Sequence, residues 1–379
     1  MAIFGCALGN QSRNTIIGGE KMKNLQDIAQ QIYQKTGVVT STKDVEKILS
    51  ASAATSHFWE IITLSQRPFP VVAEVIELLR QEGLVEVDQN REIKFNSKGM
   101  GYLKSLNIAP KKVYTCPHCE GRGINLSQLE DLVRRFDEIT VDRPKAISDY
   151  DQGFVTTQTV ISRIALMAER GDLEGKKLFV LGDDDLVSIA AGLSGMPKEI
   201  VVLEIDDRLV NYINDTAKKY NLPIEAMKYD FRDKLPEKYL GYFDTFITDP
   251  PETVEALELS VGRGISTLRK EGCAGYFGVT LIEASLEKWN IFQQILTSKF
   301  KVAITDIIYD FNHYVNWDYL LKTVGKPYDF IQVEPKLNWY RSSMYRIETL
   351  KDSKGIENEY KPCELYVDEE AIIYKGEDK

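Results

Sequence analysis

The second half of the chain alternates between two patterns of apolar residues. Short apolar runs typical of buried strands are followed by longer stretches in which apolar residues recur every three or four positions, as in helices. The strand-like runs are KKLFVLG, EIVVLEI, EAMKY, FDTFIT, GCAGYFGVT, VAITDIIYD and SSMYRIETL. Between Asp151 and Leu350 this succession predicts an α/β fold, with a doubly wound, mostly parallel sheet covered by helices on both faces. Such sheets bind ligands at the carboxyl ends of their strands.

The first third of the chain follows a different pattern. PVVAEVIELLRQEG has helical spacing and stops at Gly83, LVEVDQNREIKF alternates around a polar turn, and NSKGMGYLKSL follows. A helix, a two-stranded wing and a second helix predict a winged-helix-like domain over residues 24–109. Winged helices often bind DNA, but this helix carries three glutamates and one arginine, whereas a recognition helix normally presents basic or amide side chains. We therefore favour a dimerisation or substrate-covering module, and a homodimer.

The remaining segments are assigned by composition. Residues 1–23 are expected to be a disordered extension, and residues 351–379 an acidic, flexible tail. Residues 110–150 are interpreted as a connector with one amphipathic helix, from about Leu126 to Glu138, and a Cys-Pro-His-Cys motif.

The net charge and the length of the apolar runs limit the classes of molecule that this protein can bind. The 379 residues have a formal net charge of -10, so the average surface repels phosphates and attracts cations. Nucleic acid is therefore an unlikely partner, and a basic substrate is favoured. No apolar run approaches the roughly 18 residues of a membrane span, which predicts a cytoplasmic protein without membrane contact. Five scattered cysteines do not form a secreted disulfide framework.

The Cys-Pro-His-Cys motif places Cys116 and Cys119 at the spacing of half a zinc site. Zinc prefers four ligands, and the other cysteines are distant in sequence. His118 lies between the pair, and Cys273 falls in a predicted strand. A structural zinc, a redox pair and a plain turn with reduced thiols all stay open.

Three consecutive acids follow the first predicted strand of the α/β region. Gly182 is followed by Asp183, Asp184 and Asp185, where dinucleotide and S-adenosylmethionine sites usually carry several glycines. The acids would repel a pyrophosphate or a methionine carboxylate, whereas a cofactor with an amine and no carboxylate would be attracted. The alternative is that one aspartate caps the next helix and the others are solvated, but capping needs only one.

Acids also follow the next strands. Glu204 ends the second strand, where a carboxylate can accept hydrogen bonds from a ribose diol. After the third strand, Asp230 could accept from an adenine amino group and Phe231 could stack on the ring. Asp249 follows the fourth strand and precedes two prolines and Glu252, which fixes it stiffly and suits it to bind and deprotonate an amine. The alternatives for these acids are helix caps and helix-start residues.

Taken together, GDDD, LEID, DF and TDPPETVEA, in this order, resemble the aminopropyltransferase relatives of methyltransferases. More closely, the chain resembles the archaeal and thermophilic branched-chain polyamine synthases, which make N4-bis(aminopropyl)spermidine. The likeness runs through CPHC, YDQGFVT, FVLGDDDL, GCAGYFG and YVNWDY to NWYRSSMYRIETL, nearly the whole chain after residue 24. It implies a methyltransferase-like, Rossmann-like aminopropyltransferase domain over residues 151–350.

The resemblance implies decarboxylated S-adenosylmethionine as donor, spermidine as acceptor and methylthioadenosine as released product. It makes Asp184 the key catalytic acid, and we place Asp249 beside it. Three acids are expected to bind the polyamine: Asp183, Asp185 and Glu252. Five residues are expected around the nucleoside: Gln152, Gly182, Glu204, Asp230 and Phe231. The alternative function is an S-adenosylmethionine-dependent methyltransferase acting on nucleic acid, suggested by the winged helix and DPPE. A third is a DNA-binding regulator with a degenerate enzyme domain. The acidic first loop and the net charge disfavour both.

Overall fold

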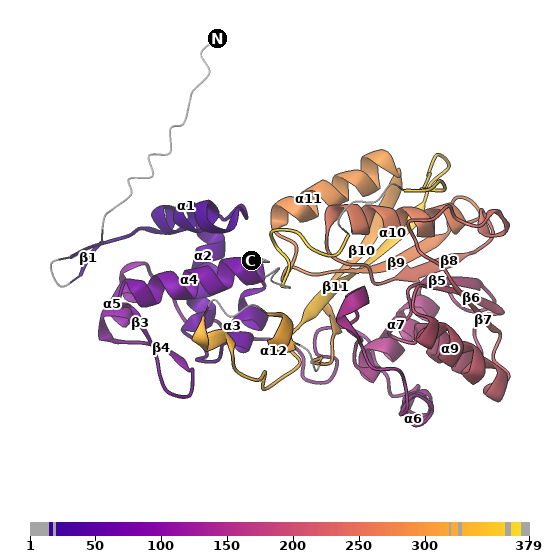
Figure 1. Ribbon diagram of the computed structural model, residues 1–379, viewed down its shortest axis with the longest axis horizontal. Coiled ribbons are helices and arrows are strands. Elements are labelled where there is room, and N and C mark those ends of the chain that lie inside the picture. Colours follow the sequence, from indigo (N-terminus) through magenta and orange to yellow (C-terminus); the bar gives the residue numbers. More distant parts are fainter. Residues whose placement is uncertain (1–14, 18–19, 318–319, 325–327, 361–364, 373–379) are drawn as a thin grey trace, which may run out of the picture. The chain divides into compact units, whose positions relative to one another are not determined.

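The computed structural model describes residues 15–17, 20–317, 320–324, 328–360 and 365–372 (Figure 1). The described chain divides into two compact units. The N-terminal unit comprises the described residues up to Ser65, then Pro70–Lys112 and residues 328–333. The C-terminal unit comprises Gln66–Phe69, the described residues from Val113 to Val324, and those from Glu334 onwards.

The N-terminal unit is helical with two small hairpins. Its elements are β1 Thr15–Ile17, β2 Glu20–Met22, α1 Leu25–Thr36, α2 Thr42–Ser52, α3 Phe58–Ser65, α4 Phe69–Gln81, β3 Val85–Val87, β4 Ile93–Phe95 and α5 Ser97–Ser105. Helices α1 and α2 each begin with a capping box, formed by Asn24 with Asp27 and by Ser41 with Asp44. Strands β3 and β4 pair in antiparallel fashion between α4 and α5. The helix, hairpin and second helix are thus present, and their assignment as a winged helix stays a prediction.

The segment expected to be a disordered extension contains a short hairpin. Strands β1 and β2 pair in antiparallel fashion, with Thr15 opposite Met22. Met22 is buried, and the Tyr102 hydroxyl donates to the carbonyl of Lys23 at 2.7 Å. Pairing of two three-residue strands needs no long apolar pattern, so hydrophobic periodicity gives no sign of it. Residues 1–14 and 18–19 lie outside the described residues.

Residues 328–333, which lie between β10 and β11 in sequence, belong to the N-terminal unit. The indole N–H of Trp59 donates to the carbonyl of Val333 at 2.6 Å. Phe330 is buried and its ring stacks on that of Tyr328, with centroids 5.3 Å apart. Sequence analysis placed this segment in the α/β domain, because a short insertion between two strands carries no periodicity of its own.

The C-terminal unit is built on a seven-stranded sheet. Its elements are α6 Glu130–Ile139, α7 Thr157–Glu169, β5 Lys177–Leu181, α8 Val187–Ser194, β6 Glu199–Glu204, α9 Asp207–Tyr220, β7 Ile224–Lys228, β8 Thr245–Thr248, α10 Val254–Thr267, β9 Ala274–Val279, α11 Leu286–Gln294, β10 Val302–His313, α12 Leu320–Thr323 and β11 Arg341–Thr349. The strand order is β10-β11-β9-β8-β5-β6-β7, and only β11 runs antiparallel to its neighbours. The expected α/β class and parallel-dominated sheet are confirmed. No helix in the described part of the chain combines the length and the apolar character needed to cross a membrane.

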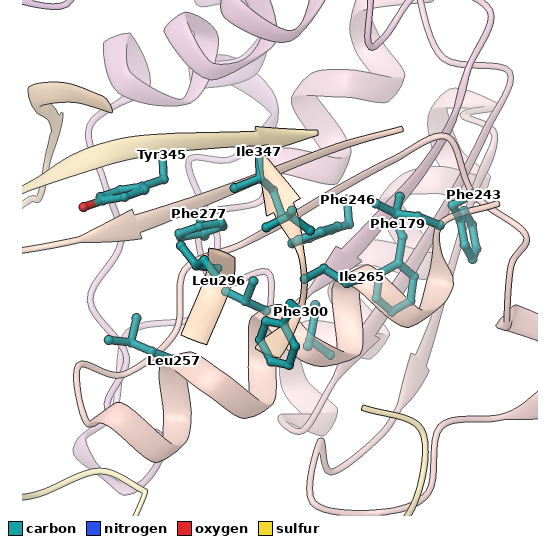
Figure 2. Close-up of a cluster of buried hydrophobic side chains, with 14 of the residues drawn as sticks. Phe179, Phe243, Phe246, Leu257, Ile265, Phe277, Leu296, Phe300, Tyr345 and Ile347 are labelled. Atoms are coloured by element: carbon teal, nitrogen blue, oxygen red, sulfur yellow. The ribbon is translucent and has the colours of Figure 1, made fainter. Parts of the chain in front are cut away.

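Helices cover both faces of this sheet, with α10 and α11 on one face and α7 and α9 on the other (Figure 1). Figure 2 shows the core under α10, where Phe246 of β8 and Phe277 of β9 pack with Leu257 and other apolar side chains. A Cβ at Gly275 would overlap the Phe246 ring, so close packing requires glycine there. This packing fixes the strands whose carboxyl ends carry the acids.

The described part of the expected flexible tail packs against the C-terminal unit. Leu365 and Ile372 are buried, and the Glu370 carboxylate accepts hydrogen bonds from the backbone N–H and hydroxyl of Ser285. The Lys288 ammonium pairs with Asp368 at 2.7 Å. Apolar residues spaced among many charges are enough to dock this segment, although its composition predicts a solvated one. Residues 361–364 and 373–379 lie outside the described residues.

Candidate active site

A pocket of about 1190 Å³, part of it open to solvent, lies where β5, β6 and β8 end. All of its lining residues belong to the C-terminal unit. Six carboxylates line it: Asp151, Asp184, Glu204, Asp249, Glu252 and Glu283. Seven aromatic residues join them: Tyr150, Tyr229, Phe231, Tyr314, Trp317, Tyr340 and Tyr366. No lysine, arginine or histidine of the described chain lines this pocket, so its potential favours a ligand with several positive charges.

The structure brings most of the predicted site residues to this pocket. Seven of them line it: Gln152, Gly182, Asp184, Glu204, Phe231, Asp249 and Glu252. They meet because β5 lies between β6 and β8 in parallel, so the loops after these strands emerge at one edge of the sheet. Asp183, Asp185 and Asp230 do not line the pocket, and neither do Cys116 and Cys119.

Asp183 and Asp185 are buried and bind protein groups, and substrate binding by these two acids stays a prediction. The Asp183 carboxylate accepts hydrogen bonds from the backbone N–H, at 3.2 Å, and the hydroxyl of Ser188 in the first turn of α8. The Asp185 carboxylate accepts from the Val155 N–H at 2.6 Å and pairs with Arg163 at 2.5 Å. Consecutive side chains of the loop point in different directions, so only the middle acid reaches the pocket.

Asp230 is paired with an arginine, and its contact with adenine stays a prediction. Its carboxylate pairs with the Arg232 guanidinium, whose Nε and Nη2 lie 3.0 and 2.5 Å from Oδ2 of Asp230. The carboxylate also accepts a hydrogen bond from the backbone N–H of Arg232. Burial opposes ionisation, but the hydrogen bonds and charge of Arg232 hold the pKa of Asp230 below its usual value. The neighbouring Phe231 does line the pocket.

Glu204 is a buried acid held by backbone donors. Its Oε2 accepts from the Asp183 N–H at 2.7 Å and its Oε1 accepts from the Asp206 N–H at 2.9 Å. Burial raises the pKa of Glu204, and these two N–H groups oppose the rise. Each oxygen keeps a lone pair for a ligand hydroxyl. Gln152, beside it, is fixed by donating to Asp206 at 3.0 Å and accepting from the Ile147 N–H at 3.0 Å.

Asp184 is half-buried, and its carboxylate accepts from a single donor of the described residues. The Gly153 N–H donates to Oδ2 at 3.0 Å, while Arg143 donates to the backbone carbonyl of Asp184. Among the described residues, no lysine or arginine pairs with this carboxylate. Burial, together with the negative charges of Asp185, Glu204 and Asp249, raises the pKa of Asp184 well above its usual value. Such a carboxylate can accept a proton near neutral pH.

Asp249 is held by two strong donors on one oxygen. Nη2 of Arg163 and the hydroxyl of Tyr314 lie 2.6 and 2.7 Å from Oδ2 of Asp249. Burial raises the pKa of Asp249 and the adjacent Asp185 adds to the rise, but the Arg163 charge opposes it. Asp184 and Asp249 therefore share one pocket in different electrostatic surroundings.

Glu252 and Glu283 form a second acidic pair in this pocket. Glu252 Oε1 accepts from the Thr280 N–H at 3.0 Å, whereas its buried Oε2 has no donor among the described residues. Glu283 accepts from the Tyr340 hydroxyl at 2.6 Å and from the Ile372 N–H at 2.7 Å. Burial raises the pKa of both carboxyls, and the charge of Glu283 raises that of Glu252 further.

Sequence reasoning missed Glu283 and Asp151. Glu283 follows the carboxyl end of β9, so the rule that identified Asp249 could have found it. Asp151 precedes Gln152 in YDQGFVT, outside any strand end, and no pattern marks it. Burial, and then the charge of Glu283, raises the pKa of Asp151 well above its usual value.

The Cys-Pro-His-Cys motif forms a turn in which Cys116 is exposed. Backbone N–H groups of Cys119 and His118 lower the pKa of the Cys116 thiol. Cys273 is buried immediately before β9. The described residues contain no cluster of three or more histidines, cysteines or acids that could hold a metal ion, so a structural zinc, one of the three alternatives for this motif, finds no third ligand among them. Cys6 and Cys363 lie outside the described residues.

Comparison with known protein families identifies the family to which the chain belongs. Residues 131–373, which include every acid of the pocket, match the branched-chain polyamine synthase A C-terminal domain. The chain belongs to the branched-chain polyamine synthase family. The family resemblance predicted from the sequence is therefore confirmed.

Relatives from two organisms cover nearly the whole chain. The N(4)-bis(aminopropyl)spermidine synthase of Methanocaldococcus jannaschii is 49% identical over 92% of this chain and 99% of its own. That of Thermus thermophilus is 39% identical over 86% of this chain and 93% of its own. A solved structure of the Thermus thermophilus branched-chain polyamine synthase, in complex with N4-aminopropylspermidine and 5'-methylthioadenosine, has a TM-score of 0.86 at 37% identity. It covers 93% of this chain and 99% of that chain.

Proposed function

We infer that this enzyme transfers aminopropyl groups from decarboxylated S-adenosylmethionine to the N4 amine of spermidine. The products are N4-aminopropylspermidine, then N4-bis(aminopropyl)spermidine, with one methylthioadenosine released per transfer. The observation that carries this is a pocket that the described residues line with six carboxylates and no basic side chain, in a member of this family. The donor is a sulfonium with an amine and no carboxylate, and the acceptor is a polycation, so both match the potential of the pocket. A methyltransferase acting on nucleic acid is disfavoured, because a methionine carboxylate or a phosphate would meet six carboxylates and no basic side chain of the described residues.

We propose that the nucleoside binds at the ends of β5 and β6. Glu204 is placed to accept hydrogen bonds from the ribose diol through the lone pairs that its backbone donors leave. Gly182 has a φ of +71° and no side chain, which allows the ligand close to the backbone. Gln152 and Phe231 border the same space, and Phe231 offers a ring for stacking. Asp230 as adenine acceptor stays a proposal, and it requires the carboxylate to exchange Arg232 for the base.

The transfer is a displacement at carbon. A lone pair on N4 of spermidine attacks the methylene carbon next to the sulfonium, the C–S bond breaks, and its electrons leave with the sulfur as a neutral thioether. Alkylamines titrate near 10.4, so the bound polyamine arrives protonated and must lose the N4 proton. We assign that proton to Asp184, whose raised pKa suits a base, and we assign orientation of the amine to Asp249.

The ends of the polyamine need partners as well. We propose that Glu252, Glu283 and Asp151 bind its primary ammonium groups, since Oε2 of Glu252 is buried and accepts nothing from the described chain. Trp317 and Tyr340 add ring faces on which ammonium groups are stabilised. Asp183 and Asp185, whose carboxylates bind Ser188 and Arg163, support the loop that presents Asp184.

The decisive experiment is mass spectrometry of products made from spermidine. With decarboxylated S-adenosylmethionine we expect the masses of one and then two added aminopropyl groups, and with S-adenosylmethionine no methylated product. Asp184→Asn should lower turnover by about 100- to 10,000-fold, because it removes the proton acceptor. Methylthioadenosine affinity should stay within about twofold of wild type, as the Glu204 contacts are untouched. Faster methyl transfer than aminopropyl transfer would refute the assignment.

Three further features are proposed with this function. The N-terminal unit is a winged-helix-like module that serves dimerisation or covers the substrate, and the enzyme is a homodimer in the cytoplasm. The helix–hairpin–helix order of α4, β3, β4 and α5 supports the first proposal. Light scattering on the full chain tests the second, since a monomer mass at working concentration would contradict it.

A further inference from the structure

A buried arginine lies directly behind Asp249. Arg163 projects from α7 and is only 2% exposed. Its Nη1 pairs with Asp185 at 2.5 Å, and its Nη2 pairs with Asp249 at 2.6 Å. Its Nε donates to the side-chain oxygen of Asn312 at 2.9 Å. Arg163 does not line the pocket. It therefore joins two acids of which only Asp249 reaches the ligand space.

The contacts of Asp249 are divided unevenly between its two oxygens. Arg163 and the Tyr314 hydroxyl both bind Oδ2. Oδ1 lies over Gly278 of β9, where a Cβ would overlap it, and no donor of the described residues binds it. One oxygen is thus fixed by the protein, and the other remains for a donor from the ligand.

We propose that Arg163 is a positioning residue for aminopropyl transfer, which fixes the Asp249 carboxylate so that Oδ1 meets the attacking N4 nitrogen of spermidine. The inference rests on the proposed function, because it deepens the account of the same pocket. Arg163 acts through Asp249 and touches neither the donor nor the acceptor. Arg163 should contribute strongly to the rate of transfer, because a displacement needs the attacking nitrogen in line with the C–S bond. A misplacement of about 1 Å can lower the rate about 100-fold.

The charge of Arg163 has a second effect, on protonation of Asp249. The groups that face Asp249 are Arg163 from α7, Tyr314 after β10, Asp184 and Asp185 after β5, and Glu252 before α10. Arg163 is the cation among them, and it opposes the rise in pKa that burial and Asp185 cause. Without it, Asp249 stays protonated to higher pH and cannot accept an amine N–H. The acid limb of the kcat profile should then move to higher pH.

The same sheet provides a matched control. Arg346 of β11 binds Asp172 at 2.8 Å through Nε, and the Tyr276 hydroxyl donates to the same oxygen of Asp172. We call Arg163, Asp249 and Tyr314 the carboxyl-end cluster, and Arg346, Asp172 and Tyr276 the amino-end cluster. Arg346 is 6% exposed, and none of the amino-end cluster lines the pocket. Both arginines are buried partners of an aspartate and a tyrosine, but only one serves an acid of the site.

The test compares Arg163→Met, Arg163→Lys and Arg346→Met in the full-length enzyme. We measure kcat against pH at saturating spermidine and decarboxylated S-adenosylmethionine, methylthioadenosine affinity, and Tm. Arg163→Met should lower kcat about 100-fold and move its acid limb to higher pH, with methylthioadenosine affinity unchanged. Arg163→Lys should restore part of the pH profile, because it keeps the charge. Arg346→Met should lower Tm and leave the pH profile as in wild type.

Two further variants keep the test decisive if Arg163→Met does not fold. Arg163→Met with Asp185→Asn removes one charge of each sign, and Gly278→Ala displaces Oδ1 of Asp249 without touching Arg163. Both should lower kcat while methylthioadenosine still binds. If the Arg163 variants match Arg346→Met in kcat and pH profile, or if Gly278→Ala turns over normally, the inference is overturned alone. A wild type that forms no aminopropylated product would overturn the proposed function first.

Discussion

The carboxyl-end and amino-end clusters use the same three residue types at opposite ends of the parallel strands. Asp249 follows β8 at its carboxyl end, whereas Asp172 precedes β5, and its carbonyl accepts from the hydroxyl of Thr245, the first residue of β8. In both, a buried arginine and a tyrosine hydroxyl bind one aspartate oxygen. Asp249 and Tyr314 of the carboxyl-end cluster line the acidic pocket, whereas no residue of the amino-end cluster lines it in the part of the chain that the structure describes.

This comparison separates structural need from function. Burying an ion pair is costly, and breaking one by removing a partner typically costs about 3–5 kcal/mol of stability. Both clusters carry that cost, so burial and an ion pair alone do not mark an active site. What distinguishes Asp249 is that it lines the pocket, at the strand edge where ligands bind, whereas Asp172 does not.

The largest effect is expected from the aspartates themselves. Asp249→Asn should lower kcat by about 100- to 10,000-fold, because the amide cannot take over the charge that orients the amine. Asp172→Asn should lower Tm but keep kcat within about threefold of wild type. Steady-state turnover and thermal denaturation of both variants measure this. Equal losses of kcat would erase the distinction between the two clusters.

A smaller effect is expected at Glu204, another acid at the carboxyl end that protein donors hold. Glu204→Gln should weaken methylthioadenosine binding by about 10- to 100-fold, the worth of a hydrogen bond to a charged group. Turnover at saturating donor should change less, because N4 is activated elsewhere in the pocket. Calorimetric titration with methylthioadenosine gives the affinity. An unchanged affinity would remove Glu204 from the nucleoside site.

The pocket acids should also lower the stability of the free enzyme as pH rises, whereas acids in ion pairs usually raise stability with rising pH. Burial raises the pKa of Asp184, Glu252 and Glu283 above their unfolded values near 4. As pH rises past those values the unfolded chain loses protons first, so this contribution to stability of the free enzyme falls with rising pH until the folded pKa values are passed. Spermidine should offset the loss, raising Tm by a few degrees more at pH 8 than at pH 5. Sodium chloride at matched ionic strength is the control, and an equal gain at both pH values would contradict the account.

The smallest effect is expected at the Cys-Pro-His-Cys turn, which neither cluster contacts in the described structure. Cys116→Ser and Cys119→Ser should change kcat by less than about twofold, and chelator should not alter the rate, because this turn does not line the pocket. Metal analysis of the purified enzyme runs beside the assay. Immediate loss of activity on chelation, with the fold intact, would instead make a metal part of the site.

Strand ends were the most informative part of the sequence. Apolar runs located β5, β6, β8 and β9, and parallel pairing then required the acids behind them to converge, which is why Asp184 and Asp249 were found together. The orientation of consecutive loop residues is not encoded in such a pattern. Gly182 and Leu186 both adopt positive φ, of 71° and 59°, and turn the loop so that Asp183 and Asp185 face protein donors.

Long-range supports were equally hidden. Arg163 lies in α7, where an arginine among apolar residues could as well be solvated, and its role depends on Asn312 about 150 positions away in the chain. Ile372 reaches Glu283 from a segment whose composition predicts a solvated tail. Such contacts depend on tertiary packing, and local periodicity does not report them.

Residues 328–333 limit how independently the two parts of this chain can evolve. Phe330 and Ile331 are fully buried, the Phe330 ring lies 5.6 Å from that of Phe58, and Trp59 binds the Val333 carbonyl. A protein without the residues before Val113 would lose this insertion's partners and expose both apolar side chains to water. An N-terminal unit exchanged between relatives would need a matching stretch between β10 and β11. These two segments, distant in the gene, should therefore change in step among homologues.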